Sequence, residues 1–314
     1  MPYKSPIVRF EKFLGLQVLA FTTNGSIDFA LNDQPSFNSK QKKFLSRQHL
    51  DPTCFGFMKQ VHGKKIIVVR KPSCISVGAP SAMNCGGGRP TVAQQGDGMM
   101  TQRPGIPLSV RTADCLSVFI FDPKKIAIAL VHAGWKGTQK KIVANAVRLM
   151  KRKWKTKAKD LKVAFGPSIR KCCYEVGEEF KKLFPNACCH CEPRRSLSGR
   201  SNLDFKNQIA SSSAQKIQPP RPAALAPHAL FRKAKLSGRG GRNDTIKRLY
   251  LDLPLVNKRQ LLKTGVRARN IFDCGICTCC NSKYFSFRRD GKKAGRMLSV
   301  MMIKDQRKNE RPGQ

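Results

Sequence analysis

Two continuous apolar runs joined by a four-residue turn constrain this chain more than any other feature. The runs are LSVFIF (116–121) and IAIALV (126–131), each of strand length, and DPKK (122–125) stands between them. Asp and Pro suit the early positions of a type I turn, so the pattern predicts an antiparallel hairpin. The outer ends of such a hairpin lie side by side. We therefore expect Cys115, just before the first run, to lie near His132, just after the second.

Strand-like and helix-like stretches alternate on both sides of this hairpin and predict an α/β fold with helices packed against a mixed sheet. A helix is expected after an N-cap at Thr138, because apolar residues then recur at spacings of three and four. Those residues are Ile142, Val143, Ala146, Leu149 and Met150. Further strands are expected at 13–21, 64–70, 161–165 and at least twice in 270–303, with a short helix at 175–184 and a strand and helix within 246–266 that end at Gly265.

Two segments differ in composition from the alternating part. Residues 76–98 are rich in Gly, Pro and Ser and are too long for an ordinary connection, so they are expected to form a lid or an insertion. Residues 186–245 have no sustained periodicity and are predicted to be a long, flexible, low-complexity insertion. The predicted organisation is a single globular domain built from 1–185 and 246–305, interrupted by 186–245 and followed by a basic tail at 306–314.

The composition is that of a folded soluble protein, with 40% hydrophobic residues in a chain of 314. No apolar run approaches the roughly 20 residues that a membrane-spanning helix needs, so we expect no membrane and a cytoplasmic location. The 13 cysteines are odd in number, and several are adjacent in sequence. Adjacent cysteines make poor disulfide partners, so thiols or metal ligands are expected instead of a secreted disulfide framework.

A formal net charge of +41 makes nucleic acid a candidate partner. The basic residues are spread along the chain, and the densest block, 151–159, ends a predicted helix, where cations suit the helix dipole. The sequence has no Cys₂His₂ finger, RNP motif or KH-type loop. It therefore predicts at most non-specific nucleic-acid binding.

Three residues at predicted strand ends carry the chemistry of a candidate site. His62, Cys115 and His132 could hold Zn²⁺, or copper, with a fourth position open for water or substrate. A second interpretation is a Cys115 nucleophile with His132 as base and Asp114 or Asp97 as orienting group, which predicts a metal-free Cys-His hydrolase. A third is that the residues are structural. His62 discriminates between the first two, because only a metal site needs a second histidine.

A second group of cysteines, CGICTCC (274–280), contains two Cys-x-x-Cys spacings. With Cys188, Cys189, His190 and Cys191 it could complete a structural zinc site. Core packing of Cys274 and Cys277 is the alternative.

Eight motifs in a fixed order identify a family resemblance. They are KQVHG, GDGMMT, RTADC, VHAGWKGT, GPSIRKCCYEVGEEF, LDLPLVNKRQLL, CTCC and FSFRRDGKKAGRM, and they cover roughly 15–185 and 246–303. The chain resembles the YfiH-type family, whose members are labelled purine nucleoside phosphorylase or multicopper polyphenol oxidoreductase (laccase-like). The resemblance implies a layered α/β sandwich of mixed sheets with flanking helices, often dimeric.

The resemblance also implies one zinc ion bound by the residues that match the family's ligands, His62, Cys115 and His132. It implies phosphorolysis of adenosine, inosine, guanosine and S-methyl-5'-thioadenosine, together with deamination of adenosine. Copper-dependent polyphenol oxidation is the alternative family activity, but this sequence lacks the many histidines that a multicopper cluster demands.

Charged residues in the family motifs are candidates for the remaining roles. Arg288, Arg289, Arg296 and Lys136 are candidate phosphate or oxyanion partners, with solvated surface charge as the alternative. Asp97 and Asp114 are candidates for orienting ligands or moving protons, with turn formation as the alternative. The sequence departs from the family pattern at two positions, Asn24 and Lys136, where the family has arginine.

Overall fold

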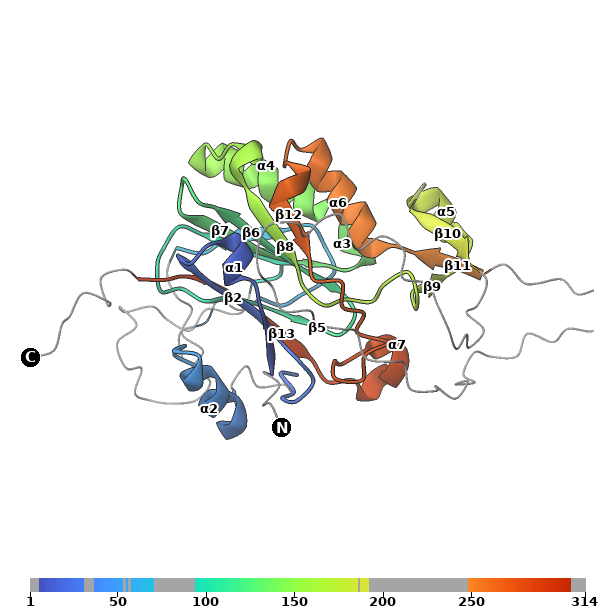
Figure 1. The fold of residues 1–314 in the computed structure, drawn as a ribbon, viewed down its shortest axis with the longest axis horizontal. Coiled ribbons are helices and arrows are strands. Elements are labelled where there is room, and N and C mark those ends of the chain that lie inside the picture. The colour runs from blue at the N-terminus through green and yellow to red at the C-terminus, as the bar shows by residue number, and fades with distance from the viewer. Residues whose placement is uncertain are drawn as a thin grey trace, which may run out of the picture.

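In the computed structural model, the predicted hairpin occupies the middle of a six-stranded mixed sheet (Figure 1). Its strands, β6 (Leu116–Asp122) and β7 (Ala127–Ala133), pair antiparallel with Ser117 opposite His132. Every residue of both strands is buried, which explains their continuous apolar character. The hairpin and its alignment of Cys115 with the end of β7 thus agree with the sequence analysis.

Three sheets and seven α-helices make up the part of the chain that the structure describes, which is residues 6–30, 37–52, 55, 58–70, 94–185, 187–191 and 248–305. The other strands of the six-stranded sheet are β3 (Ile66–Val68), β4 (Gly98–Thr101), β8 (Lys162–Phe165) and β12 (Ile271–Asp273). A four-stranded antiparallel sheet contains β1 (Ile7–Arg9), β2 (Val18–Thr23), β5 (Leu108–Thr112) and β13 (Met297–Ile303). A small sheet contains β9 (Glu175–Val176), β10 (Cys188–Cys191) and β11 (Arg248–Leu251).

The longer helices lie on the outer faces of the two larger sheets (Figure 1). The described helices are α1 (Glu11–Leu14), α2 (Ser39–Arg47), α3 (Trp135–Gln139), α4 (Ile142–Trp154), α5 (Glu179–Leu183), α6 (Leu253–Lys263) and α7 (Phe287–Asp290). Short 3₁₀ turns lie at Ala158–Asp160, Ala268–Asn270 and Gly291–Lys293.

Alternate residues of the hairpin face two different cores. Val118 and Val131 belong to a core that includes residues of α4 and α6, whereas Phe119 and Leu130 belong to a core shared with β2, β5 and β13. The outer face of the four-stranded sheet packs on α2 through Phe44. The result is the predicted layered sandwich, with helices outside and two sheets inside.

The strand predicted at 13–21 is wrong in its first half. Helix α1 continues to Leu14, the chain turns at Gly15 with a φ of 138°, and β2 begins at Val18. A positive φ of this kind favours glycine and ends regular structure. Leu16 lies in this turn and is 76% exposed. It extended the apolar run in the sequence without being part of a buried strand.

Thr138 does not cap the long helix, contrary to the prediction. It lies inside α3, where its hydroxyl accepts a hydrogen bond from Asn257 of α6 at 3.0 Å. Lys141, with a φ of 58°, separates α3 from α4. The predicted apolar face of α4 is present, since Ile142 and Met150 are among its fully buried residues.

Long-range pairing changes the boundaries near the insertion. Glu175 was predicted to start a helix but pairs with Tyr250 as part of β9, and the helix begins only at Glu179. Residues 188–191 of the predicted insertion form β10, which pairs with β11. Residues 76–93, 192–247 and 306–314 lie outside the described part of the chain, so the predicted lid, most of the insertion and the tail are not tested.

Among the described residues, no helix combines the length and the apolar character needed to cross a membrane.

Packing between the two larger sheets predicts a large effect of Phe119→Ala. Phe119 is fully buried, and its ring centroid lies 4.7 Å from that of Phe10. We expect the free energy of unfolding, measured by urea denaturation, to fall by about 3–5 kcal/mol. The control Leu16→Ala, at an exposed position, should change it by less than about 0.5 kcal/mol. Equal effects of the two variants would contradict the packing described here.

Candidate metal centre

Three segments bring His62, Cys115 and His132 to one place. His62 lies in the loop before β3, Cys115 directly precedes β6, and His132 is the second-last residue of β7. One ligand atom from each side chain lies within 4.8 Å of the others. Cys115 Sγ is 3.9 Å from His62 Nε2, and the two imidazole ring centroids are 4.9 Å apart. His132 is buried and His62 exposed, so the group opens to solvent on one side.

The buried carboxylate of Asp97 connects two of these segments. It accepts hydrogen bonds from the backbone N–H groups of Val61, His62 and Gly63, at 3.3, 2.9 and 2.6 Å. It also accepts one from His132 Nδ1 at 2.9 Å. This bond leaves Nε2 as the ring nitrogen of His132 that can bind a metal, an arrangement common among metal-binding histidines. Asp97 thus positions two of the three candidate ligands.

Local backbone geometry allows the close approach of the side chains. His62 has a φ of 56°, in the left-handed region. A Cβ at Gly134 would lie 3.0 Å from Cys115 Sγ and 3.0 Å from His62 Cδ2. A larger residue at Gly134 would therefore displace the ligands.

The side chains of the group alter one another's protonation. Burial opposes ionisation of Cys115, but the charge of His132 and hydrogen bonds from His132 and His62 outweigh it and lower the pKa of Cys115 to about 6. Burial likewise opposes the charged form of His132, but Cys115 and Asp97 raise the pKa of His132 to about 9. Asp97 is also buried, yet hydrogen bonds from His132 and Gly63 hold its pKa below the ordinary value.

The donor set fits a borderline-soft divalent ion. One thiolate and two imidazoles are typical ligands of zinc, and three protein ligands leave a fourth position for water or substrate. The structure therefore contains a His/Cys group of the type that binds metal.

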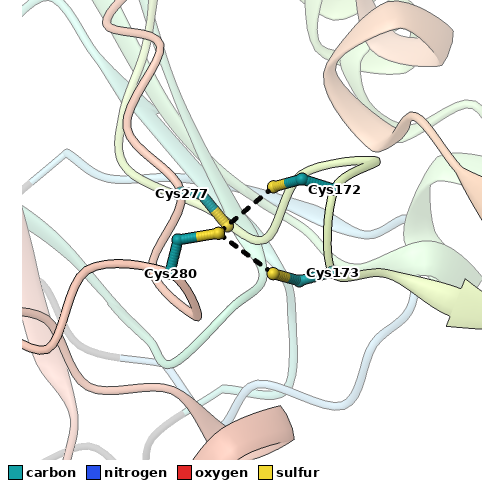
Figure 2. Close-up of side chains that lie close together, drawn as sticks. All are labelled: Cys172, Cys173, Cys277 and Cys280. Atoms are coloured by element: carbon teal, nitrogen blue, oxygen red, sulfur yellow. Dashed lines mark hydrogen bonds between the residues drawn. The ribbon is translucent and has the colours of Figure 1, made fainter. Parts of the chain in front are cut away.

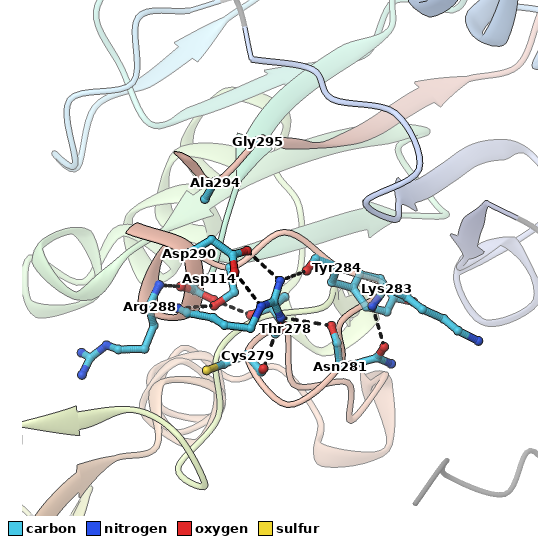
Figure 3. A network of polar contacts seen from close by, with 12 residues as sticks. Asp114, Thr278, Cys279, Asn281, Lys283, Tyr284, Arg288, Asp290, Ala294 and Gly295 are labelled. Carbon is cyan, nitrogen blue, oxygen red and sulfur yellow. Dashed lines mark hydrogen bonds and ion pairs between the residues drawn. The ribbon is translucent and has the colours of Figure 1, made fainter. Parts of the chain in front are cut away.

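Asp114 occupies a different position from Asp97, although both were candidates for the same roles. Its carboxylate accepts hydrogen bonds from Thr278 Oγ1 and from the backbone N–H of Arg288, both at 2.6 Å (Figure 3). Its carbonyl accepts a bond from the N–H of Ile169 at 2.9 Å. Its φ is 89°. Asp114 thus fixes the turn before Cys115 and attaches the C-terminal loops to it.

The guanidinium of Arg289 is occupied by its own surroundings. It donates to the carbonyls of Thr278, Cys279 and Tyr284 at 3.0, 3.2 and 2.8 Å, and forms an ion pair with Asp290. These bonds hold the loop together, and phosphate binding by Arg289 stays a prediction.

Arg288 lines an open cleft of about 440 Å³, and Lys136 lies next to Trp135, another lining residue. The cleft is lined by Trp135, Tyr174, Phe180 and Arg288 together with residues 175–177. The Arg288 guanidinium lies 5.3 Å from the Tyr174 ring centroid and donates to the Glu175 carbonyl at 2.9 Å. The exposed Lys136 lies with its Nζ 5.4 Å from the Trp135 ring centroid.

Two observations place this cleft next to the His/Cys group. Trp135 directly follows Gly134, and the backbone of Gly134 lies so close to Cys115 and His62 that a side chain at this position would contact both. Arg288, which lines the cleft, donates its backbone N–H at 2.6 Å to the carboxylate of Asp114, the residue before Cys115. An aromatic cleft with a cationic edge therefore adjoins the candidate metal ligands.

Arg111 lies close to the loop that carries His62, but its sequence position did not mark it as a candidate site residue. It lies on β5, and its backbone exchanges two hydrogen bonds of 2.9 Å with the side chain of Gln60, two residues before His62. Burial and the positive charge of Arg296 lower the pKa of Arg111. The guanidinium of Arg296 donates to the carbonyl of Ala294 at 2.6 Å. The available signal was a charged residue within the otherwise uncharged strand LSVRT, just before the TADC motif.

The chain is similar in sequence to a known protein family. The model of the family described as multi-copper polyphenol oxidoreductase laccase matches residues 22–216 and 225–304. The chain is 30% identical over 212 residues to a purine nucleoside phosphorylase of Clostridium acetobutylicum, and the match covers 67% of this chain and 68% of that one.

The chain is also similar to a second curated protein and to a solved structure. The chain is 29% identical over 204 residues to adenosine deaminase RL5 of an unknown prokaryotic organism, covering 65% of this chain and 60% of that one. The crystal structure of YlmD from Geobacillus stearothermophilus superposes with a TM-score of 0.65 at 22% identity and covers 97% of this chain and 98% of that one. That likeness confirms the layered α/β fold. Because the family model matches most of the chain, the protein belongs to the multi-copper polyphenol oxidoreductase laccase family, the YfiH-type family that the sequence motifs identified.

Proposed function

We propose that the protein is a zinc-dependent purine nucleoside phosphorylase that acts on adenosine, inosine, guanosine and S-methyl-5'-thioadenosine and also deaminates adenosine. The observation that carries the proposal is the convergence of His62, Cys115 and His132 beside an aromatic cleft. The names of two relatives, a purine nucleoside phosphorylase and an adenosine deaminase, support the same substrate class.

Zinc is the ion that this donor set favours. His62, Cys115 and His132 would hold it, and Asp97 would keep His132 in the tautomer that binds through Nε2. When bound, the ion would supply a Lewis acid at the cleft. The chain has five histidines in all, two of them in this group, which is too few for a multicopper cluster.

The cleft offers surfaces for a purine nucleoside. Trp135 and Tyr174 are aromatic side chains against which a purine ring could stack. Arg288 lies at the same cleft with its guanidinium over Tyr174. A fixed cation at this position suits a phosphate or the ribose hydroxyl groups.

Phosphorolysis places further demands on the site. A phosphate oxygen forms a bond to the anomeric carbon, the glycosidic C–N bond breaks, and the purine leaves with a proton. The chain's contribution is to bring the anion to the nucleoside and to stabilise the departing base. Arg288, which lines the cleft, supplies positive charge for the phosphate. The homodimer implied by the family resemblance stays a prediction, to be checked by light scattering.

An incubation of the zinc-loaded protein with adenosine, with and without phosphate, tests the proposal. Chromatography should show adenine and ribose 1-phosphate only when phosphate is present, inosine in either case, and loss of all products after chelation. Absence of every product would contradict the proposed function. Activity that survives complete metal removal would identify the Cys-His hydrolase alternative, and oxygen consumption with a polyphenol would identify the oxidoreductase.

Zinc binding should depend on Asp97 as well as on the ligands. We expect Cys115→Ala to lose the ion from this site and Asp97→Asn to weaken zinc affinity by about 10- to 100-fold, because the orienting bond to His132 is weakened. Competition with a fluorescent chelator measures both effects. The matched control Cys274→Ala removes a partly buried cysteine outside the group. An affinity in Asp97→Asn equal to that of the control would contradict the orienting role.

Arg288 should contribute to substrate binding through its charge. We expect Arg288→Ala to reduce kcat/KM for phosphorolysis by about 10- to 100-fold, the range expected for loss of one charge-assisted hydrogen bond. Arg288→Lys should recover part of this loss. The control Lys292→Ala removes an exposed charge in the following turn and should leave the kinetics unchanged. Equal kinetics for Arg288→Ala and the control would remove Arg288 from the site.

A further inference from the structure

Four cysteines form a second group, separate from the candidate metal centre. Cys172 and Cys173 lie in the loop between β8 and β9, and Cys277 and Cys280 lie in the loop between β12 and α7 (Figure 2). All four sulfur atoms lie within 4.8 Å of one another. Figure 2 shows the four side chains pointing toward a common centre.

Neither sequence-based interpretation of CGICTCC named the thiols that lie beside Cys277 and Cys280, which are those of Cys172 and Cys173. The predicted site with Cys188, Cys189, His190 and Cys191 is not tested, because the side chains at 188–191 lie outside the described part of the structure. Cys277 was also predicted to pack in the core, but it lies in the sulfur group, whereas Cys274 does pack against the core. The two loops are 104 positions or more apart in sequence, so neither contains a complete metal-binding motif.

Contacts other than the thiols hold the two loops together. Ser168 exchanges backbone hydrogen bonds with the other loop, donating to Ile276 at 3.2 Å and accepting from Thr278 at 3.1 Å. The Arg170 guanidinium forms a two-pronged ion pair with Asp273. The fold therefore brings the two loops together through contacts that do not involve the thiols.

The spacing of the sulfur atoms fits a single ion. Four sulfurs at 2.3 Å from one tetrahedral zinc ion lie about 3.8 Å apart. Cys173 Sγ and Cys280 Sγ are 3.1 Å apart, and Cys172 Sγ and Cys280 Sγ are 3.4 Å apart, with no pair beyond 4.8 Å. An iron–sulfur cluster would need wider spacing, because its irons and sulfides must fit between the cysteines.

The surroundings do not explain the group as packing. Cys172 and Cys280 are exposed, and Cys173 and Cys277 are partly exposed, so the thiols fill no core cavity. Cys277 and Cys280 have the Cys-x-x-Cys spacing that is common in structural zinc sites. We propose that Cys172, Cys173, Cys277 and Cys280 bind one structural zinc ion as a tetrathiolate site.

Such an ion would stabilise one wall of the aromatic cleft. Tyr174, which lines the cleft, directly follows Cys173. On the other side, Asp114 binds Thr278, next to Cys277, and also the backbone of Arg288. Crosslinking the two loops would therefore fix Tyr174 and Arg288 relative to each other without contact between this ion and the substrate.

Metal analysis of the full-length chain, purified in the presence of a reductant, tests the proposal. We expect Cys277→Ser and Cys172→Ser each to lower the zinc content by about one ion per chain, the occupancy of one closed structural site. The matched control Cys279→Ser, in the same loop but outside the group, should retain the full content. Cys115→Ala should also retain this ion. If only the proposed catalytic site is wrong, Cys115→Ala leaves the zinc content unchanged. If only the tetrathiolate site is wrong, Cys277→Ser and Cys172→Ser leave it unchanged.

X-ray absorption at the zinc edge tests the proposal in a chain that keeps all four cysteines, so it does not depend on the folding of the Cys277→Ser and Cys172→Ser variants. In the Cys115→Ala chain, the remaining zinc should have four sulfur neighbours at about 2.3 Å. Nitrogen or oxygen neighbours in place of sulfur would overturn the proposal. Unchanged zinc content in both Cys277→Ser and Cys172→Ser, or a disulfide between Cys280 and Cys172 or Cys173 in the zinc-treated protein, would overturn it as well.

Discussion

The geometry of the candidate site depends on one buried carboxylate. Asp97 accepts hydrogen bonds from three consecutive N–H groups of the loop that carries His62 and from the imidazole of His132. A buried charge is tolerated when its oxygens are fully hydrogen-bonded, and here the same bonds fix two candidate ligands. These bonds therefore hold the loop before β3 and the end of β7 in register, and Cys115 reaches them from the adjacent end of β6.

The hairpin supplies the rigid part of this arrangement. Both of its strands are buried on both faces, between helices on one side and the four-stranded sheet on the other. The C-terminal loops are attached to the hairpin through Asp114, which bonds Thr278 and Arg288. Through these bonds, the candidate metal centre, the cleft and the four-cysteine group form one connected region.

The sequence was informative where the signal was local. The apolar runs of the hairpin predicted the convergence of its two ends, and the spacing of apolar residues predicted the buried face of α4. Local patterns did not distinguish Asp97 from Asp114, since both precede strands. Their different roles follow from tertiary contacts, of Asp97 with residues 61–63 and of Asp114 with Thr278 and Arg288. The roles of Thr138 and Arg289 also depend on tertiary partners. The pairing of Cys172 and Cys173 with Cys277 and Cys280 requires the parallel pairing of β8 with β12, which no local spacing encodes.

Anomalous diffraction at the zinc edge from crystals of the zinc-loaded protein tests the central claim most directly. The account predicts an anomalous peak within bonding distance of His62, Cys115 Sγ and His132, at about 2.0–2.3 Å from each ligand atom, with His132 Nδ1 still bonded to Asp97. Crystals that contain zinc elsewhere in the chain but show no peak among these three side chains would contradict it.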